Sequence, residues 1–233
     1  MRVAALYDIH GNVPALEAVL ADVARADVDA VVIGGDVVAG PWPTETYALL
    51  EALDLPTTWV RGNADRELLG EGGRAPAEVV EWVRAQLDHA AIEKLANDPL
   101  TATLEIDDLG PVLFCHATPR DASEIRTAIS PDERWAEVLD GVAEGVVVCG
   151  HTHVQFDRAA AGKRIVNAGS IGMPYEDEPG AYWALLGPGV EHRRSTYDVA
   201  AMRAAVAETG YPSEWPEASA QEATEYFESI AYD

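Results

Sequence analysis

Short apolar runs that end in polar side chains are the feature that most constrains how this chain folds. Three such runs occupy the first 65 residues, and they lead to Asp8 with His10, to Asp36 and to Asn63. Each run has the length and the flanking residues of a buried strand, and helical periodicity follows the first two. This alternation predicts a parallel α/β layer. Ligands gather at the carboxyl ends of strands in such layers, so these side chains are expected to lie along one edge.

The hydrophobic period changes after residue 100. Residues 101–106 alternate and 112–115 are apolar, which predicts a hairpin and therefore a second sheet with antiparallel pairing. The hairpin ends at His116, and another apolar run leads to His151 and His153. Further strands are expected at 146–149, 154–158, 164–167, 181–186 and 190–197, and helices at 13–23, 44–53, 75–97 (as two helices), 131–142, 198–210 and 217–230.

The length favours one domain. A chain of 233 residues with 48% hydrophobic residues is long enough for one substantial core, so we expect a single domain over residues 1–233. Residues 211–233 are expected to form a C-terminal helical extension packed on the body, with a lid or a dimer element as the alternatives. Asn12 and Ser130 are expected to cap the helices that follow them.

The charge balance limits the partners. The formal net charge of −24 argues against a broad nucleic-acid-binding face and against an anionic membrane partner. An anionic substrate is still allowed, because bound cations reverse the local field. No run is long enough to span a membrane, and Asp8 interrupts the N-terminal apolar run, so a cytoplasmic location is expected. Cys115 and Cys149 end apolar runs and are expected to be buried hydrophobic residues.

The residue types at the predicted strand ends suit a metal site. A carboxylate beside an imidazole, as in Asp8 and His10, suits divalent Mn, Fe, Ni or Zn. Four of the six histidines lie at predicted strand ends, each beside a glycine or another small residue. Small neighbours let the backbone approach a metal or a phosphate closely.

Five motifs together resemble the calcineurin-like metallophosphoesterase family, and most closely its small bacterial and archaeal phosphodiesterase branch. They are Asp8-Ile9-His10, Gly35-Asp36-Val37-Val38-Ala39-Gly40, Gly62-Asn63-Ala64-Asp65, Cys115-His116-Ala117 and Gly150-His151-Thr152-His153. The motifs occur in the order and at the spacing of that family, and residues 167–186 are also similar to that branch. The resemblance implies a four-layer α/β/β/α sandwich of two mixed sheets flanked by helices.

The resemblance also implies a site for two divalent metal ions, with manganese favoured and Fe, Ni, Zn or Mg as alternatives. One ion would be held by Asp8, His10, Asp36 and His153, and the other by Asp36, Asn63, His116 and His151. Asp36, Asn63 and His116 would be the catalytic residues. The implied reaction is hydrolysis by a hydroxide that bridges the two metals, which also stabilise the charge of the transition state.

Two positions depart from the family pattern. Many relatives have a histidine, thought to protonate the leaving group, where this chain has Ala64. Loss of a general acid typically costs about 10²–10⁴-fold, so we expect poor activity on alkyl esters and a preference for leaving groups that are stable as anions. Asp65 is a substitute acid only if it holds a proton. Similar sequences have a basic residue near Tyr175, and this chain lacks it. Arg120 and Asn12 are therefore the candidate substrate contacts. The alternative for Arg120 is a surface ion pair, and the alternative for Asn12 is a helix cap.

We therefore expect a metallophosphoesterase that hydrolyses phosphodiesters or nucleotide polyphosphates. One alternative keeps the metals and acts on phosphomonoesters or phosphoproteins. The other is a non-catalytic interaction scaffold, a role that at least one similar eukaryotic protein-sorting subunit has. The complete apparent ligand set favours the enzyme. The expected partner is a small phosphate ester rather than an extended nucleic acid or a membrane, and a homodimer is a further expectation from similar proteins.

Overall fold

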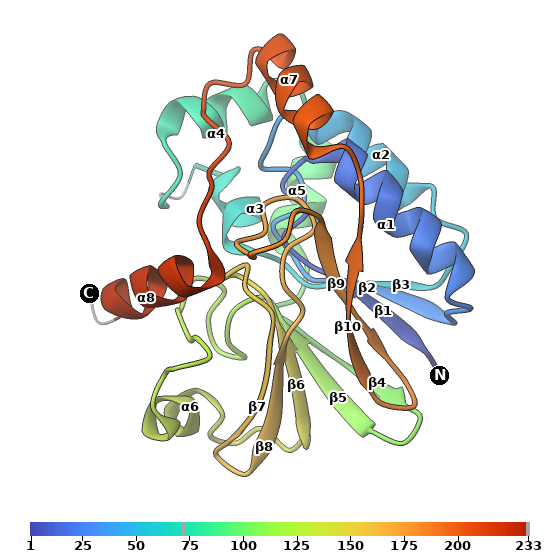
Figure 1. Ribbon diagram of the computed structural model, residues 1–233, viewed down its shortest axis with the longest axis vertical. Coiled ribbons are helices and arrows are strands. Elements are labelled where there is room, and N and C mark those ends of the chain that lie inside the picture. Colours follow the sequence, from blue (N-terminus) through green and yellow to red (C-terminus); the bar gives the residue numbers. More distant parts are fainter. Residues whose placement is uncertain (71–72, 232–233) are drawn as a thin grey trace.

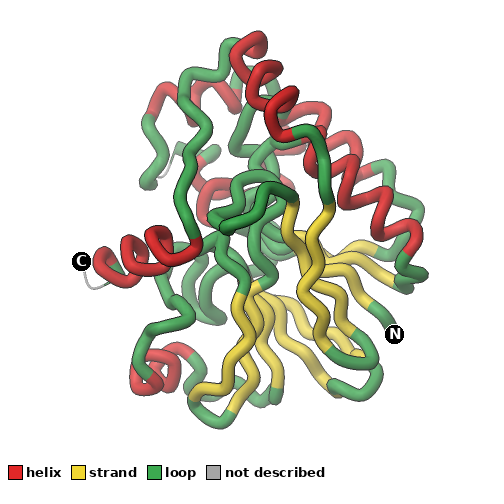
Figure 2. The backbone as a smooth tube through the Cα atoms, in the orientation of Figure 1, coloured by secondary structure: helices red, strands yellow, loops and turns green. Residues whose placement is uncertain are grey.

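Two five-stranded sheets face each other in the computed structural model, which describes residues 1–70 and 73–231 (Figure 1). Helices cover the outer side of each sheet, so the layers run helix, sheet, sheet, helix (Figure 2). This is the predicted four-layer α/β/β/α arrangement of two mixed sheets, and the prediction is confirmed.

The first sheet has the strand order β10-β9-β1-β2-β3. Its strands are β1 (Val3–Leu6), β2 (Ala30–Ile33), β3 (Thr57–Trp59), β9 (Ala181–Leu186) and β10 (Val190–Ser195). The first three are parallel, whereas β9 pairs antiparallel with both β1 and β10. The parallel part therefore directs the carboxyl ends of β1, β2 and β3 to one edge.

The second sheet has the strand order β4-β5-β6-β8-β7. Its strands are β4 (Thr101–Ile106), β5 (Gly110–Cys115), β6 (Val146–Cys149), β7 (Phe156–Ala160) and β8 (Lys163–Asn167). The expected hairpin is β4 with β5, and β5, β6 and β8 are parallel. The carboxyl ends of β5 and β6 therefore also meet at one edge.

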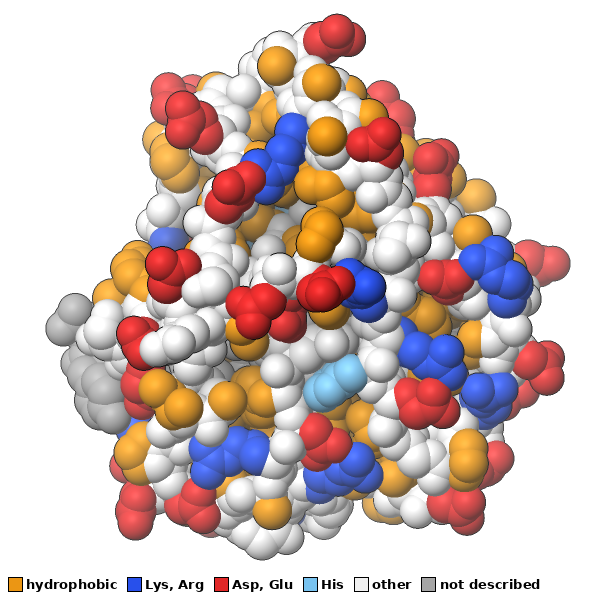
Figure 3. Space-filling view, viewed as in Figure 1, with side chains coloured by type: hydrophobic (Ala, Val, Ile, Leu, Met, Phe, Trp, Pro, Cys, Tyr) orange, Lys and Arg blue, Asp and Glu red, His pale blue; other side chains and the backbone are white. Residues whose placement is uncertain are grey.

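The described part of the chain contains eight helices. They are α1 (Val13–Arg25), α2 (Pro43–Glu51), α3 (Asn63–Glu67), α4 (Ala77–Arg84), α5 (His89–Asn97), α6 (Asp132–Val138), α7 (Val199–Thr209) and α8 (Ala220–Ile230). None of them combines the length and the apolar character needed to cross a membrane. Acidic side chains are spread over the face shown in Figure 3, with basic ones between them, as the net charge of −24 requires.

Alternation along the strands builds the core in three parts. On β1, Ala4 and Leu6 face α1 and the other covering helices, while Val3 and Ala5 face the second sheet. The second sheet closes the middle part from the other side and buries its own outer face under Trp135 of α6. The two sheets are therefore held at a fixed distance, which fixes the edges where their carboxyl ends meet.

Most expected elements are present, with shorter ends. Asp198 caps α7 and Gly210 ends it in a left-handed conformation, as expected. One local prediction is wrong: Ser130 does not cap α6, because its hydroxyl accepts from the Thr127 N–H and donates to Glu228. The short helix α3 was not among the expected elements. Cys115 and Cys149 are free and buried, which confirms that prediction.

Candidate metal centre

Loops at the carboxyl ends of β1, β2, β5 and β6 bring six candidate ligands together. Two groups form, each with ligand atoms within 4.8 Å of one another: Asp8 with His10 and His153, and Asp36 with His116 and His151. The strands that lead to these loops run toward the centre of the molecule in Figure 1, near α3. Each group draws on both sheets, so the centre forms only when the two sheets pack together.

The backbone at the ligands is strained in a consistent way. Asp8, His10, Asp36, His151 and His153 all have positive φ, between +48° and +67°. Such a conformation costs about 1 kcal/mol or more per residue and persists only where the surroundings enforce it. β1 ends at Leu6, so the alternation that was expected to align Asp8 with His10 is not what aligns them. The left-handed turns bring both side chains to the centre.

Hydrogen bonds between the loops enforce these turns. The backbone N–H of Asp8 donates to Gly35 O (3.1 Å), and that of His10 donates to Asp36 O (2.9 Å). Across the sheets, the N–H of His151 donates to Asp8 Oδ2 at 2.8 Å. The two loops of the first sheet are thereby tied to each other, and the β6 loop is tied to both through the Asp8 carboxylate.

Three of the imidazoles are oriented by backbone carbonyls. The Nδ1 atoms of His10, His116 and His153 lie 3.2, 2.8 and 2.7 Å from the carbonyl oxygens of Ala39, Gly34 and Met173, respectively. A carbonyl only accepts, so Nδ1 of each ring carries a proton and Nε2 is the atom turned to the centre. Histidines that bind metals are held in this way.

Buried acceptor atoms without partners test whether the centre fits metal ions. Asp8 Oδ1, Asn63 Oδ1, His116 Nε2 and His151 Nε2 are buried and have no hydrogen-bond partner among the described residues. Unpaired buried polar atoms are rare and costly in folded proteins. Divalent cations would satisfy all four atoms, and the mixture of carboxylate, amide and imidazole ligands suits Mn, Fe, Ni or Zn. The residues present therefore fit a pair of divalent ions.

The electrostatics of the centre favour bound cations. Burial raises the pKa of Asp36, but His116 and His10 outweigh it and hold this pKa well below its usual range. Burial lowers the pKa of His116, but Asp36 and Asp8 raise it to about 10. Burial and His116 lower the pKa of His151 to about 3. The carboxylates of Asp8 and Asp36 are therefore ionised, and in the absence of a metal the neighbouring His116 ring holds a proton. A bound cation would displace this proton.

Two glycines make room for the carboxylates. A Cβ atom on Gly62 would lie 2.0 Å from Asp36 Oδ1, and one on Gly150 would lie 2.3 Å from Asp8 Oδ2. Both distances are far below van der Waals contact. The glycines of the third and fifth motifs are therefore required by the close approach of backbone to ligand.

Asp65 holds the ligand loops together. Its Oδ2 accepts from the N–H groups of Asp36 (2.8 Å) and Gly62 (2.9 Å), and its Oδ1 accepts from the N–H of Val37 (2.9 Å). Burial and Asp36 raise the pKa of Asp65 to about 7, and cations bound at Asp36 would act against this shift. Both oxygens are engaged by the backbone, so Asp65 is placed as a structural brace rather than as a donor to a leaving group.

The two predicted substrate contacts are placed differently. Asn12 is fully buried; its Oδ1 accepts from Ala15 N at the start of α1, and its Nδ2 donates to Gly172 O. This geometry supports a helix cap and does not support a phosphate contact. Arg120 lies in a hollow of about 280 Å³ that it shares with Asn63. Its guanidinium also pairs with Glu124, at 2.6 and 3.0 Å.

Arg61 lines the same hollow as Arg120. Arg61 and Arg66 line it together with Arg120 and Asn63. Arg61 Nε is buried and has no hydrogen-bond partner among the described residues. Glu67 and Asp121 line the same hollow, so the three guanidinium groups leave it with only a small excess of positive charge, in a chain of net charge −24.

Two aromatic residues at the centre were not predicted as site residues. Tyr175 stacks on His153, with ring centroids 5.2 Å apart and planes 19° apart, and Phe227 of α8 lies 6.5 Å from the His151 ring. Tyr175 could have been found from its position beside the Met-Pro pair of the 167–186 segment. Phe227 is remote in sequence and carries no local signal.

Comparisons with known proteins agree with this geometry. The model of the calcineurin-like phosphoesterase superfamily domain matches residues 1–186. An uncharacterized protein of Methanocaldococcus jannaschii is 29% identical over 195 residues, which cover 80% of this chain and 74% of that protein.

Two solved structures share the fold. The crystal structure of a metallophosphoesterase from Sphaerobacter thermophilus is 26% identical with a TM-score of 0.74, and the match covers 91% of this chain and 95% of that one. A hypothetical protein from Pyrococcus horikoshii has a TM-score of 0.78 at 20% identity, over 97% of each chain. The family match covers most of the sequence and includes all seven candidate ligands, and this chain belongs to the calcineurin-like phosphoesterase superfamily.

Proposed function

We propose that this chain is a divalent-metal-dependent hydrolase of phosphodiesters or nucleotide polyphosphates, with manganese as the favoured metal. The observation that carries the proposal is the pair of three-residue ligand groups, one around Asp8 and one around Asp36, whose unpaired acceptor atoms are buried. Two divalent cations supply positive charge that activates water for attack and stabilises the charge that develops on the phosphoryl group.

The chain's own residues would perform the remaining tasks. Asn63 contributes a neutral oxygen, which leaves the centre more positive toward a phosphate than a carboxylate would. Arg61 and Arg120 would orient the phosphate or a neighbouring phosphate from the shared hollow. Guanidinium groups suit this task because they bind phosphate oxygens in a planar, bidentate manner.

The leaving group would have to depart without a proton from Ala64 or Asp65. Ala64 occupies the position at which many relatives have a histidine, and both oxygens of Asp65 are engaged by backbone N–H groups. No protein donor is therefore placed for the leaving group among these residues. The proposed substrates have leaving groups that are stable as anions, such as aryl oxides and nucleotide phosphates. The acidic surface favours a small substrate over an extended nucleic acid.

A paired assay tests the proposal. The protein is stripped of metal, reloaded with manganese and assayed with bis(4-nitrophenyl) phosphate and with 4-nitrophenyl phosphate. Diester turnover that a chelator abolishes is the expected result. A preference for the monoester would move the assignment to phosphatases, and no turnover of either ester with metal bound would favour the scaffold role.

Variants of the hollow extend this assay. Arg61→Ala should raise KM for the diester about 10- to 150-fold, because one charge-assisted contact contributes about 1.5–3 kcal/mol. Arg193→Ala, at a surface ion pair on β10, is the matched control and should leave KM unchanged. Equal effects of the two substitutions would remove Arg61 from the proposed site.

A further inference from the structure

The C-terminal helix α8 reaches the metal centre although it is remote in sequence. The Phe227 ring lies 6.5 Å from the ring of His151 and 6.1 Å from that of Tyr175, and Tyr226 lies 5.6 Å from Phe227. We call Tyr175, Tyr226 and Phe227 the aromatic wall. It touches both candidate metal groups, because Tyr175 stacks on His153 of one group and Phe227 lies beside His151 of the other.

The aromatic side chains of α8 are not needed to complete the core. Ala223 is the buried residue of this helix, and Tyr226 is 60% exposed. Polar contacts hold the helix instead: Glu228 accepts from the hydroxyls of Thr127 (2.7 Å) and Ser130 (2.5 Å). An apolar surface that is left partly exposed beside a polar centre is typical of a binding surface.

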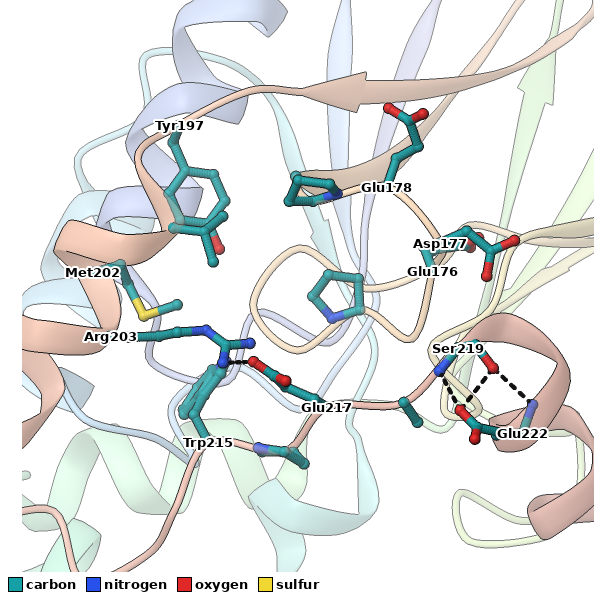
Figure 4. Close-up of a pocket in the computed structure, with 16 residues that line it drawn as sticks. Glu176, Asp177, Glu178, Tyr197, Met202, Arg203, Trp215, Glu217, Ser219 and Glu222 are labelled. Carbon is teal, nitrogen blue, oxygen red and sulfur yellow. Dashed lines mark hydrogen bonds and ion pairs between the residues drawn. The ribbon is translucent and has the colours of Figure 1, made fainter.

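The linker before α8 fixes where the helix starts. It crosses a hollow of about 560 Å³ between α7 and the loop before β9, where Glu217 pairs with Arg203 of α7 (Figure 4). Ser219 and Glu222 then form a capping box at the first turn of α8 (Figure 4). Ala223 and Phe227 are four residues apart and therefore lie on one face of the helix. Since Ala223 is buried, the face that carries Phe227 is the one turned to the protein.

We propose that the aromatic wall binds an aromatic ring of the substrate, so that this chain prefers phosphate esters that carry a base or an aryl group. The inference rests on the proposed function and adds a substrate class to it. Aromatic side chains bind rings by stacking, which tolerates different rings because every ring offers a face. A ring-bearing substrate also agrees with Ala64, because an aryl oxide leaves without being protonated.

A binding experiment tests the wall without requiring turnover. Phenylphosphonate and methylphosphonate present the same phosphonate oxygens and differ in the ring. Their Kd values are measured by isothermal titration calorimetry on the manganese-loaded full chain. Stacking predicts that phenylphosphonate binds about 5- to 150-fold more tightly than methylphosphonate. Phe227→Leu keeps an apolar side chain of good helix propensity and should bring the ratio to about 2-fold or less.

Two further variants provide a second test of the wall and a control. Tyr226→Ala changes an exposed side chain and should lower the ratio without affecting the fold. Ile129→Ala changes the other large hydrophobic side chain that is exposed among the described residues, outside the wall, and should leave the ratio unchanged. A full ratio in Phe227→Leu, or equal binding of the two phosphonates by the unmodified chain, would overturn the aromatic wall. Failure of both phosphonates to bind the manganese-loaded chain would overturn the proposed function, and the wall with it.

Discussion

The carboxylate of Asp65 gives the sharpest prediction about the architecture of the centre. It is 1% exposed and accepts three backbone N–H groups, from Asp36, Val37 and Gly62. These donors belong to the loops after β2 and β3, so Asp65 joins two loops that carry candidate ligands. Asp65→Ala would leave all three donors buried without an acceptor.

The cost can be worked from those three hydrogen bonds. A buried donor without an acceptor costs about 1–3 kcal/mol. Partial relaxation of the loops reduces the sum, so we expect Asp65→Ala to lower the free energy of unfolding by about 3–6 kcal/mol. A chain of 233 residues has an unfolding entropy of about 0.5 kcal/mol/K near its Tm. The Tm should therefore fall by about 6–12 °C.

Thermal unfolding followed by circular dichroism, on protein stripped of metal, measures this effect directly. Asp65→Asn keeps one acceptor oxygen and should lose less stability than Asp65→Ala. If Asp65 instead served as a general acid for the leaving group, both variants would keep the Tm and lose turnover of alkyl esters. An unchanged Tm in both variants, with turnover of alkyl esters lost and turnover of aryl esters kept, would refute the structural role.

Three further predictions concern the ligands and their neighbours. Asp36→Asn should lower diester turnover by orders of magnitude while the fold survives, as circular dichroism would show; normal turnover with metal controlled would remove Asp36 from the centre. Ala64→His should raise turnover of alkyl esters up to about 10²-fold and that of aryl esters less, and equal gains on both would contradict the argument about the leaving group. Gly62→Ala should weaken manganese binding in calorimetry, since its Cβ would lie 2.0 Å from Asp36 Oδ1; unchanged affinity would show that the loop adapts.

Part of the fold and of the candidate site could be predicted for a physical reason. Parallel strands bring their carboxyl ends to one edge, which places Asp8, Asp36 and Asn63 near one another. His116 follows a strand of the other sheet, so its approach to Asp36, like the four-layer packing, was predicted only by the resemblance to the family. Strand alternation does not account for the placement of Asp8 and His10. β1 ends at Leu6, and both residues have left-handed backbone conformations beyond it. Alternation does not describe a loop whose conformation is set by hydrogen bonds to another strand end.

Contacts between distant segments could not be predicted in this way. The amphipathic pattern of α8 showed that one face is buried, but no local signal says that Phe227 meets His151. The sequence also could not distinguish a helix cap from a phosphate contact at Asn12, because both roles use the same side-chain amide. The structure engages that amide with Ala15 and Gly172.

The central claim is that this chain holds two divalent ions in one centre, and counting the bound ions tests it most directly. The metal-free protein is dialysed to equilibrium against manganese, and the metal bound per chain is measured by elemental analysis. The account predicts two ions per chain. Asp36→Asn should bind fewer ions, because the Asp36 carboxylate is expected to bind both. One ion or fewer per chain at saturating manganese would contradict it.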